Sequence, residues 1–235
     1  MKPIKFESEV REVKQLSPSV KSFLLTIPDQ FSFEPGQFVT LFVNIGNTIE
    51  RRSYSIASSV GQKGFIEVCV DSVEHGRVSP HVHAFQKGQK VTVQGPLGVF
   101  ILKPDAKEKE NVFIATGTGI TPFVSMIPYL LEQTKKKVIL LAGYKHEDEI
   151  LYDDIFRSLT KKYNNFEYHT IISRPKNSTY IRETGYVQAL LEKRVPVDFA
   201  GDFYLCGLFN MIKDVGKLLV ERKINKERII FERYD

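Results

Sequence analysis

Cysteine is scarce in this sequence, because Cys69 and Cys206 are the only two and they lie far apart. No C-x-x-C pair exists, so the chain cannot assemble a zinc ribbon or the thiolate ligands of an iron–sulfur cluster, and we predict no metal site. Apolar runs long enough to cross a membrane are also missing. The first ten residues are charged and do not resemble a secretory signal peptide. Two thiols without an export signal favour a cytoplasmic protein.

Charge of one sign does not dominate either. Lysine and arginine outnumber the acidic residues by 33 to 28, a formal net charge of +5. This balance suits an acidic partner, or simply a basic protein. The basic residues are scattered along the chain, which argues against a dedicated nucleic-acid binder. The oligomeric state stays open, with a monomer among the alternatives.

The character of the sequence changes near residue 103. Before that point, short β-branched and aromatic runs alternate with glycine and proline, which predicts an antiparallel β-barrel. The expected strands are residues 22–27, 37–43, 53–57, 65–70 and 90–94. Ser79 and Pro80 are expected as the N-cap and the first position of one short helix. We predict that residues 1–103 form one domain.

A polar stretch, residues 104–110, reads as a linker. After it, strands and helices alternate, which predicts a doubly wound parallel sheet over residues 111–235. The expected strands are 111–117, 138–144, 167–173, 202–207 and 228–232, and the expected helices begin at 121, 155 and 210. The acidic run Glu147–Glu149 is expected to be a solvated helix start.

Three motifs lie where strands of the second half end. Gly117-Thr118-Gly119-Ile120-Thr121-Pro122 follows the first strand, and such glycines let a backbone approach a pyrophosphate at a helix start. Ser173-Arg174 follows the third strand and suits a phosphate monoester. Cys206-Gly207 ends the fourth strand. The alternatives are a tight turn without a ligand, a solvated arginine and a buried structural cysteine.

In the first half, the stretch RRSYSIASS over residues 51–59 places charge where a strand is expected to start. Arg52 can bind a phosphate with two hydrogen bonds, Tyr54 can lie against a planar ring, and Ser55 can hydrogen-bond a ring nitrogen. With Gly76–Ser79 they predict one ligand that has a pyrophosphate at one end and a flat heterocycle at the other. The alternative is an ordinary edge strand. Arg51 is either a second phosphate contact or a surface charge.

These motifs resemble those of the ferredoxin–NADP⁺ reductase superfamily, over nearly the whole chain. The flavin signature R-x-Y-S stands here as Arg52-Ser53-Tyr54-Ser55, and G-x-x-S stands as Gly76-Arg77-Val78-Ser79. The nicotinamide-dinucleotide signature G-T-G-x-x-P is Gly117 to Pro122. The pair Cys206-Gly207 with Met211, and Glu232-Arg233-Tyr234 near the end of the sequence, complete the match.

The resemblance implies an FAD-dependent NAD(P)H oxidoreductase that passes electrons to an acidic ferredoxin or flavodoxin. The implied FAD contacts are Arg52, Ser53, Tyr54, Ser55, Gly76, Arg77, Val78, Ser79, Thr118 and Tyr234. The implied NAD(P) contacts are Gly117, Thr118, Gly119, Ile120, Thr121, Pro122, Lys145, Ser173, Arg174, Cys206, Gly207 and Met211. The implied catalytic residues are Ser55, Cys206, Glu232 and Tyr234.

Two departures and three alternatives remain. Asp235 follows Tyr234, so whether Tyr234 stacks on the flavin stays open. Thr184-Gly185-Tyr186 lacks the arginine that NADPH-specific bacterial members often carry there, so the choice between NADPH and NADH stays open as well. The enzymatic alternatives are an NAD(P)H:flavin reductase that acts on free flavin and a reductase component of an oxygenase. The third alternative is a flavin-binding regulatory module without turnover.

Overall fold

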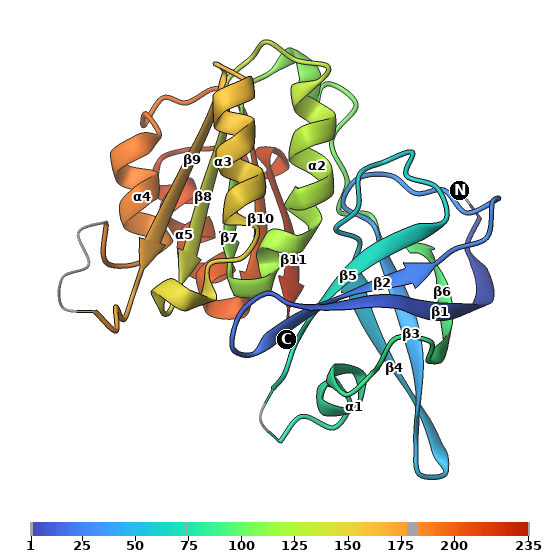
Figure 1. The fold of residues 1–235 in the computed structure, drawn as a ribbon. Coiled ribbons are helices and arrows are strands. Elements are labelled where there is room, and N and C mark those ends of the chain that lie inside the picture. The colour runs from blue at the N-terminus through green and yellow to red at the C-terminus, as the bar shows by residue number, and fades with distance from the viewer. Residues whose placement is uncertain (1, 74, 178–182, 235) are drawn as a thin grey trace. The chain divides into compact units, whose positions relative to one another are not determined.

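The computed structural model describes residues 2–73, 75–177 and 183–234. By its contacts the chain divides into two compact units (Figure 1). The barrel unit comprises Met1–Ile101 and Thr121–Tyr129, and the α/β unit comprises Leu102–Ile120 and Leu130–Asp235. The predicted fold class, a β-barrel followed by a parallel α/β sheet, is confirmed. The predicted domain bounds, 1–103 and 111–235, stay predictions.

The described residues of the barrel unit form one antiparallel sheet of six strands in the order β4-β3-β6-β1-β2-β5. Its strands are β1 (Ile4–Gln15), β2 (Val20–Thr26), β3 (Phe38–Ile45), β4 (Thr48–Ser55), β5 (Phe65–Asp71) and β6 (Lys90–Leu97). A short helix, α1 (Ser79–His83), follows β5 in the sequence. An isolated bridge joins Ile56 to Val68. The sheet therefore curls until the end of β4 meets β5.

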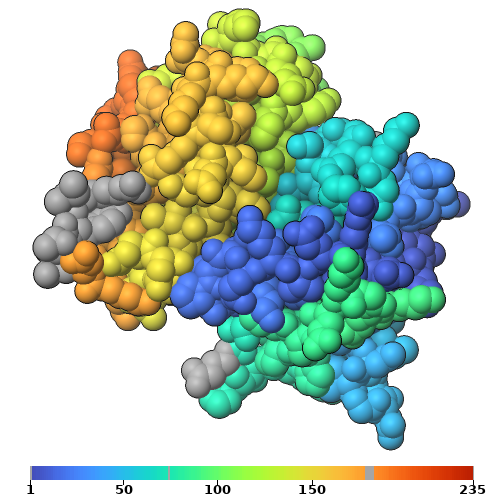
Figure 2. All heavy atoms as spheres, viewed as in Figure 1, coloured from blue at the N-terminus to red at the C-terminus, as the bar shows by residue number. Residues whose placement is uncertain are grey.

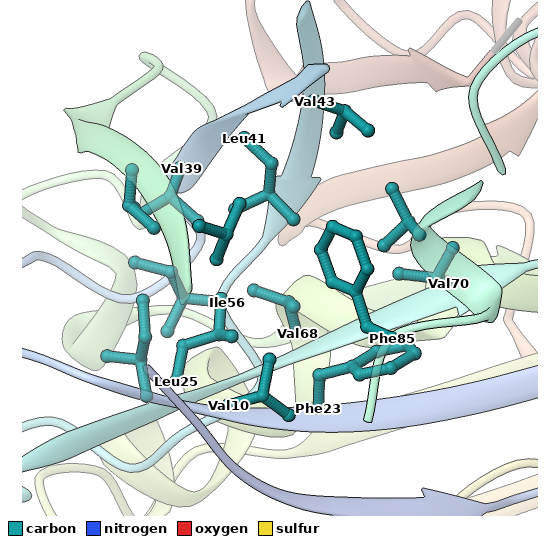
Figure 3. Close-up of a cluster of buried hydrophobic side chains, with 14 of the residues drawn as sticks. Val10, Phe23, Leu25, Val39, Leu41, Val43, Ile56, Val68, Val70 and Phe85 are labelled. Atoms are coloured by element: carbon teal, nitrogen blue, oxygen red, sulfur yellow. The ribbon is translucent and has the colours of Figure 1, made fainter. Parts of the chain in front are cut away.

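Alternation along the strands builds the core of the barrel. Val39, Leu41 and Val43 on β3 are no more than 3% exposed, whereas the residues between them are partly exposed. Figure 3 shows these three with Val68 and Phe85 in one apolar cluster. One face of the sheet is thus buried and the other meets solvent, as period-two patterning requires.

In the α/β unit, the described residues form a parallel sheet of five strands in the order β11-β10-β7-β8-β9. The strands are β7 (Asn111–Thr116), β8 (Val138–Tyr144), β9 (Phe166–Ile172), β10 (Asp202–Leu208) and β11 (Ile229–Tyr234). The α-helices of this unit are α3 (Asp153–Lys162), α4 (Val187–Arg194) and α5 (Phe209–Glu221), whereas most of α2 (Thr121–Leu131) groups with the barrel unit. Short 3₁₀ turns are η1 (Ala106–Glu108), η2 (Gly117–Ile120), η3 (Glu147–Glu149) and η4 (Lys226–Arg228).

Every residue of β8 is buried, because α3 lies on one face of the sheet and α4 and α5 lie on the other (Figure 1). The strand order reverses between β7 and β10. Ligands of open α/β sheets bind outside the carboxyl ends of strands at such a reversal. The ends of β7 and β10 are therefore the first place to look for a site.

Four expectations about local structure need correction. Strand β1 and helix α4 were not predicted. The strand expected at 53–57 is β4, Thr48–Ser55, so Arg52 lies inside the strand and not at its start. The N-cap of α1 is Val78 and not Ser79, whose hydroxyl instead accepts the Val73 N–H at 3.1 Å. An edge strand tolerates the arginines because its charged side chains reach solvent.

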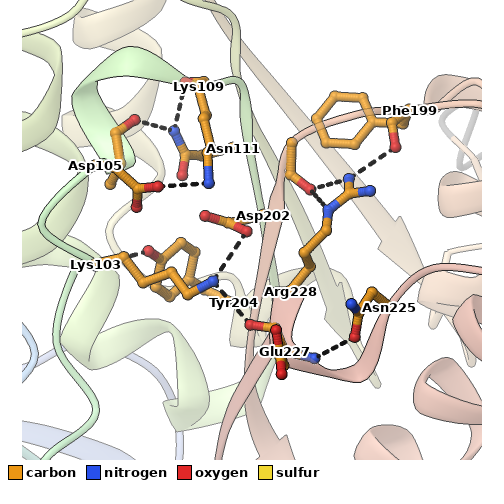
Figure 4. Close-up of polar contacts among 12 residues, drawn as sticks. Lys103, Asp105, Lys109, Asn111, Phe199, Asp202, Tyr204, Asn225, Glu227 and Arg228 are labelled. Carbon is orange, nitrogen blue, oxygen red and sulfur yellow. Dashed lines mark hydrogen bonds and ion pairs between the residues drawn. The ribbon is translucent and has the colours of Figure 1, made fainter.

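An ion pair with a buried carboxylate holds the start of the α/β unit to its sheet (Figure 4). The Lys103 ammonium lies 3.3 Å from the carboxylate of Asp202, which is 0% exposed, and donates to the Glu227 carbonyl at 2.8 Å. The Lys103 N–H donates to the Tyr204 hydroxyl at 3.0 Å. Lys103 therefore connects the entry to β7 with β10 and the approach to β11.

Among the described residues, no helix is both long and apolar enough to cross a membrane.

We expect Lys103→Met to lower the free energy of unfolding by about 3 kcal/mol, because it leaves the buried Asp202 carboxylate without its cation. Urea denaturation measures the change. The double variant K103M/D202N should recover more than half of the loss. Lys90→Met is the control, since Lys90 and Glu7 are both about two-thirds exposed and exposed ion pairs contribute little to stability. Equal losses in the two single variants would contradict this role of Lys103.

Candidate functional site

The alternation of β4 determines which of its side chains share a face. Arg52 pairs with Leu41 and Tyr54 pairs with Val39 in the adjacent β3. Paired residues of antiparallel strands project from the same face of the sheet. Arg52 and Tyr54 therefore lie on the core side, where Tyr54 packs against the apolar cluster. Because β4 is an edge strand, Arg52 still reaches solvent.

The Gly76–Ser79 segment meets this same face. Glu50 pairs with Val43 and so projects beside Arg52, and its carboxylate lies 2.7 Å from the Arg77 guanidinium. A Cβ on Gly76 would come within 2.9 Å of both the Ser79 hydroxyl and the Val73 carbonyl, so no side chain fits there. Val78 is buried in the core and offers a ligand only its backbone. Two motifs some twenty residues apart thus converge on one face of the barrel.

Tyr54 remains a neutral phenol on this face. Burial raises its pKa to about 12, although the nearby Arg52 cation partly opposes that shift. A neutral ring partly embedded in apolar side chains can contact a flat heterocycle. Among the described residues, the Arg52 guanidinium bonds only the Arg51 carbonyl, at 2.7 Å. Arg52 thus has donors left for an anionic ligand.

Arg51 and Ser53 lie on the opposite face of β4. The Arg51 guanidinium lies over the Phe42 ring at 5.3 Å, and the Ser53 hydroxyl lies 3.3 Å from that of Thr40. The two arginines of RRSYSIASS are therefore directed to opposite sides of the sheet. Ser55, at the end of β4, is buried and 4% exposed.

In the α/β unit, the glycine turn after β7 packs directly on the end of β10. Gly117 has a φ of +54°, which favours glycine, and open space around it. A Cβ on Gly119 would overlap the carbonyl oxygen of Cys206. The two motifs therefore meet at the reversal of strand order, as the sequence predicts. Thr118 is partly exposed on this turn, whereas Ile120, Thr121 and Pro122 are buried where α2 begins.

The ends of β7 and β10 also pack closely beside this contact. A Cβ on Gly207, whose φ is +147°, would overlap the Thr116 hydroxyl and lie 3.1 Å from the Met211 side chain. Thr116 Oγ1 is buried, and no described residue satisfies it. A buried hydroxyl without a partner is unfavourable unless a ligand or water satisfies it. The Thr116 hydroxyl is therefore a candidate contact for a polar ligand group at this edge of the sheet.

Cys206 interacts with Glu232 and Tyr234, the two residues near the end of the sequence that the resemblance implies. It pairs with Glu232 in β11 and is 0% exposed. Burial raises the pKa of its thiol well above the usual range, the Glu232 carboxylate raises it further, and a hydrogen bond with Tyr234 opposes them. Cys206 is therefore a protonated thiol at neutral pH and not a nucleophile.

The remaining predicted residues meet where β8 and β9 end. The Arg174 N–H donates to the Lys145 carbonyl at 2.8 Å, and the Ser173 N–H donates to the Tyr144 carbonyl at 2.9 Å. Because parallel strands end at one edge of the sheet, these residues share that edge with Gly117 and Cys206. The Arg174 side chain is exposed.

Two residues of these surroundings were not predicted. Thr116 is the last residue of a buried apolar strand, and its polarity at that position was the available signal. Glu147 accepts hydrogen bonds from the backbone of the segment that follows β9. It was expected to be solvated, and no periodic pattern marks a contact between two such loops.

The comparisons with known proteins agree with both halves. An oxidoreductase FAD-binding domain matches residues 7–101, and an oxidoreductase NAD-binding domain matches residues 113–217. Ferredoxin–NADP reductase B of Sorangium cellulosum is 31% identical over 98% of this chain and 98% of its own length. The phenol hydroxylase P5 protein of Acinetobacter pittii is 30% identical over 97% of this chain, and the match covers 65% of that protein's length.

A solved structure is similar over its full length. The flavohem-like FAD/NAD-binding domain of the Vibrio cholerae nitric oxide dioxygenase superposes with a TM-score of 0.86 at 26% identity, and 97% of this chain and 98% of that chain are covered. These matches define the class, an oxidoreductase that uses FAD and NAD(P)H. The chain belongs to the ferredoxin–NADP⁺ reductase superfamily.

We expect Gly119→Ala to destabilise the protein at least twice as much as Gly117→Ala. Gly117 has open space, so its alanine variant suffers only backbone strain of about 1 kcal/mol. Alanine at Gly119 must displace the backbone of β10. Urea denaturation of the two variants gives the comparison, and a larger cost at Gly117 would show that the turn does not pack on Cys206.

The raised pKa of Cys206 makes stability fall in mildly alkaline solution. Below the unfolded thiol pKa of about 8.5, both states are protonated and the shift has no effect. Above that pKa the unfolded thiol ionises while the folded thiol keeps its proton, so stability is lost by about 1 kcal/mol between pH 8 and pH 9.5. Stability curves of the native protein and Cys206→Ala should diverge by this amount in that window. Parallel curves would contradict the shift.

Proposed function

We propose that this protein transfers hydride from NADPH or NADH to FAD and passes the electrons, one at a time, to an acidic ferredoxin or flavodoxin. The supporting observation is the match to ferredoxin–NADP reductase B over 98% of both chains. The two cysteines of these 235 residues cannot ligate an iron–sulfur cluster, which favours a carrier outside them. The net charge of +5 suits an acidic one. The cytoplasm, where both thiols would stay reduced, is the proposed location.

We infer the roles of the barrel residues from their common face. Arg52 binds the FAD pyrophosphate, because its guanidinium has donors left and lies beside the Gly76–Ser79 segment. Tyr54 contacts the isoalloxazine ring, and Ser55 lies near its N5. The Arg77 guanidinium pairs with the Glu50 carboxylate at 2.7 Å. Arg77 therefore ties the Gly76–Ser79 segment to β4.

We infer the roles of the α/β residues from the edge where they meet. Gly117–Pro122 approaches the NAD(P) pyrophosphate, and Ser173 and Arg174 bind the 2′-phosphate, with Lys145 adding positive charge. Cys206 lies near the reacting carbon of nicotinamide. The buried thiol supplies a proton-bearing, uncharged surface there. Burial and the Glu232 carboxylate keep it protonated by raising its pKa, whereas the hydrogen bond with Tyr234 acts in the opposite direction.

A reductase component of an oxygenase is the second candidate. The similarity to the phenol hydroxylase P5 protein, and to a toluate 1,2-dioxygenase electron transfer component at 27% identity, favours it. Reduction rates with NADPH and NADH, each with ferredoxin, flavodoxin and free flavin, separate transfer to a protein carrier from transfer to free flavin. We expect ferredoxin or flavodoxin to be reduced faster than free flavin. Faster reduction of free flavin would identify a flavin reductase instead.

We expect Arg52→Ala to weaken FAD binding about 10- to 100-fold, because charge-assisted hydrogen bonds to the pyrophosphate are lost. Gel filtration of the loaded protein should then separate flavin from the chain. Arg51→Ala is the matched control, since it removes the same charge from the opposite face, and it should retain flavin. Equal loss in both variants would contradict the placement of FAD on the Arg52 face.

A further inference from the structure

The segment that carries Arg174 is bound through its backbone to the segment after β8. Both backbone polar groups of Arg174 are engaged. Its N–H donates to the Lys145 carbonyl at 2.8 Å, and its carbonyl lies 2.5 Å from Nδ1 of His146. Figure 2 shows both segments, yellow and orange, at the surface of the α/β unit. The arginine thus projects from a backbone that its neighbours fix.

Glu147 extends this attachment to the next residues. One carboxylate oxygen accepts the Lys176 N–H at 2.9 Å, and the other accepts the Asn177 N–H at 2.8 Å. Pro175, between Arg174 and Lys176, has no N–H to offer. The backbone hydrogen bonds, first that of Lys176, hold the pKa of Glu147 below its usual range. One ionised side chain therefore satisfies two successive donors of a loop that has no strand partner.

The neighbouring acid makes a different contact. Asp148 binds the side chain of Lys176, with Nζ 2.8 Å from its carboxylate, and accepts no hydrogen bond from the described backbone of residues 173–177. Glu147 and Asp148 thus carry the same charge beside the same loop. They differ in that only Glu147 restrains the backbone.

This restraint matters for a guanidinium that has to meet a small anion. The Arg174 side chain is exposed, and no described residue forms an ion pair or hydrogen bond with its guanidinium. A loop that is free to move must be ordered when its ligand binds, and that loss of entropy weakens binding. Repulsion between Glu147 and a bound phosphate acts in the opposite sense. It is weak between exposed charges in water, and salt screens it further.

We propose that Glu147 is a positioning residue for recognition of the nucleotide's 2′-phosphate: its carboxylate orders residues 174–177 so that Arg174 is presented for binding. This inference rests on the proposed role of Arg174. It assigns the preference for phosphorylated over unphosphorylated nucleotide partly to an acidic residue that does not touch the nucleotide.

Binding of adenosine 2′,5′-bisphosphate and of AMP, measured by isothermal titration calorimetry, tests the proposal without any flavin chemistry. Glu147→Ala should weaken binding of the bisphosphate about 5- to 10-fold, because one or two charge-assisted hydrogen bonds that order the loop are lost. The affinity for AMP should change less than about twofold, because AMP lacks the 2′-phosphate. Glu147→Gln, which keeps one acceptor oxygen, should fall between Glu147→Ala and the native protein, and it covers the case in which Glu147→Ala fails to fold.

Asp148→Asn is the matched control, because it removes the same charge and leaves the backbone bonds intact. This variant should keep both affinities within about twofold of those of the native protein, or bind the bisphosphate slightly more tightly. The double variant R174A/E147A should bind the bisphosphate no more weakly than Arg174→Ala alone, since the two residues act through one contact.

Four results overturn the proposal. The first three are that Glu147→Ala leaves the affinity for the bisphosphate unchanged, raises it, or lowers the affinities for both ligands equally. The fourth is that Asp148→Asn weakens bisphosphate binding as much as Glu147→Ala does. If Arg174→Ala discriminates between the ligands and Glu147→Ala does not, the positioning role is wrong and the proposed 2′-phosphate site stands. If Arg174→Ala itself affects both ligands equally, the proposed 2′-phosphate site is wrong.

Discussion

The contact between Gly119 and the Cys206 carbonyl is the constraint on which the α/β unit depends. A Cβ at Gly119 would overlap the backbone of β10, so β7 and β10 can end side by side only with glycine in the turn. The order of the strands reverses at this point, where open α/β sheets bind their ligands. The buried Thr116 hydroxyl lies against the bare backbone of Gly207 beside this contact. Close packing on glycine backbone thus decides which groups lie at the ends of the two strands.

In the barrel unit the corresponding constraint is the alternation of one edge strand. Because β4 pairs with β3 in a fixed register, Arg52 and Tyr54 share a face with Glu50, whereas Arg51 lies against Phe42. A shift of the register by one residue would exchange the two arginines. The ion pair between Glu50 and Arg77 then brings the Gly76–Ser79 segment to the Arg52 face. A phosphate-binding arginine is thus distinguished from a structural one by its neighbours across the strand.

Much of this arrangement can be predicted from the sequence, and the exceptions have physical causes. The parallel strands are continuous apolar runs buried on both faces, so their positions and the turns after them were predicted closely. Strand β1 escaped prediction because charged residues alternate with its apolar ones over twelve positions. The start of β4 was misplaced because Arg51 and Arg52 look like the end of a loop, although an exposed edge strand accommodates them.

Contacts between loops could not be predicted at all. Glu147 and the N–H groups of Lys176 and Asn177 are about thirty residues apart. Neither segment has a periodic pattern, and the match depends on where β8 and β9 happen to end. The same holds for the ion pair of Lys103 and Asp202, which lie 99 residues apart in the sequence. The motifs identify which chemistry to expect, whereas such tertiary contacts decide how firmly each side chain is held.

Reduction of the bound flavin by nicotinamide nucleotide tests the central claim most directly. The FAD-loaded protein is mixed without oxygen with one equivalent of NADPH or NADH in a stopped-flow instrument, and the absorbance of the bound flavin is followed. A dehydrogenase of this superfamily should bleach the flavin with at least one of the two nucleotides within a single turnover. Flavin that stays bound and fully oxidised with both nucleotides would contradict the account and leave only a flavin-binding module.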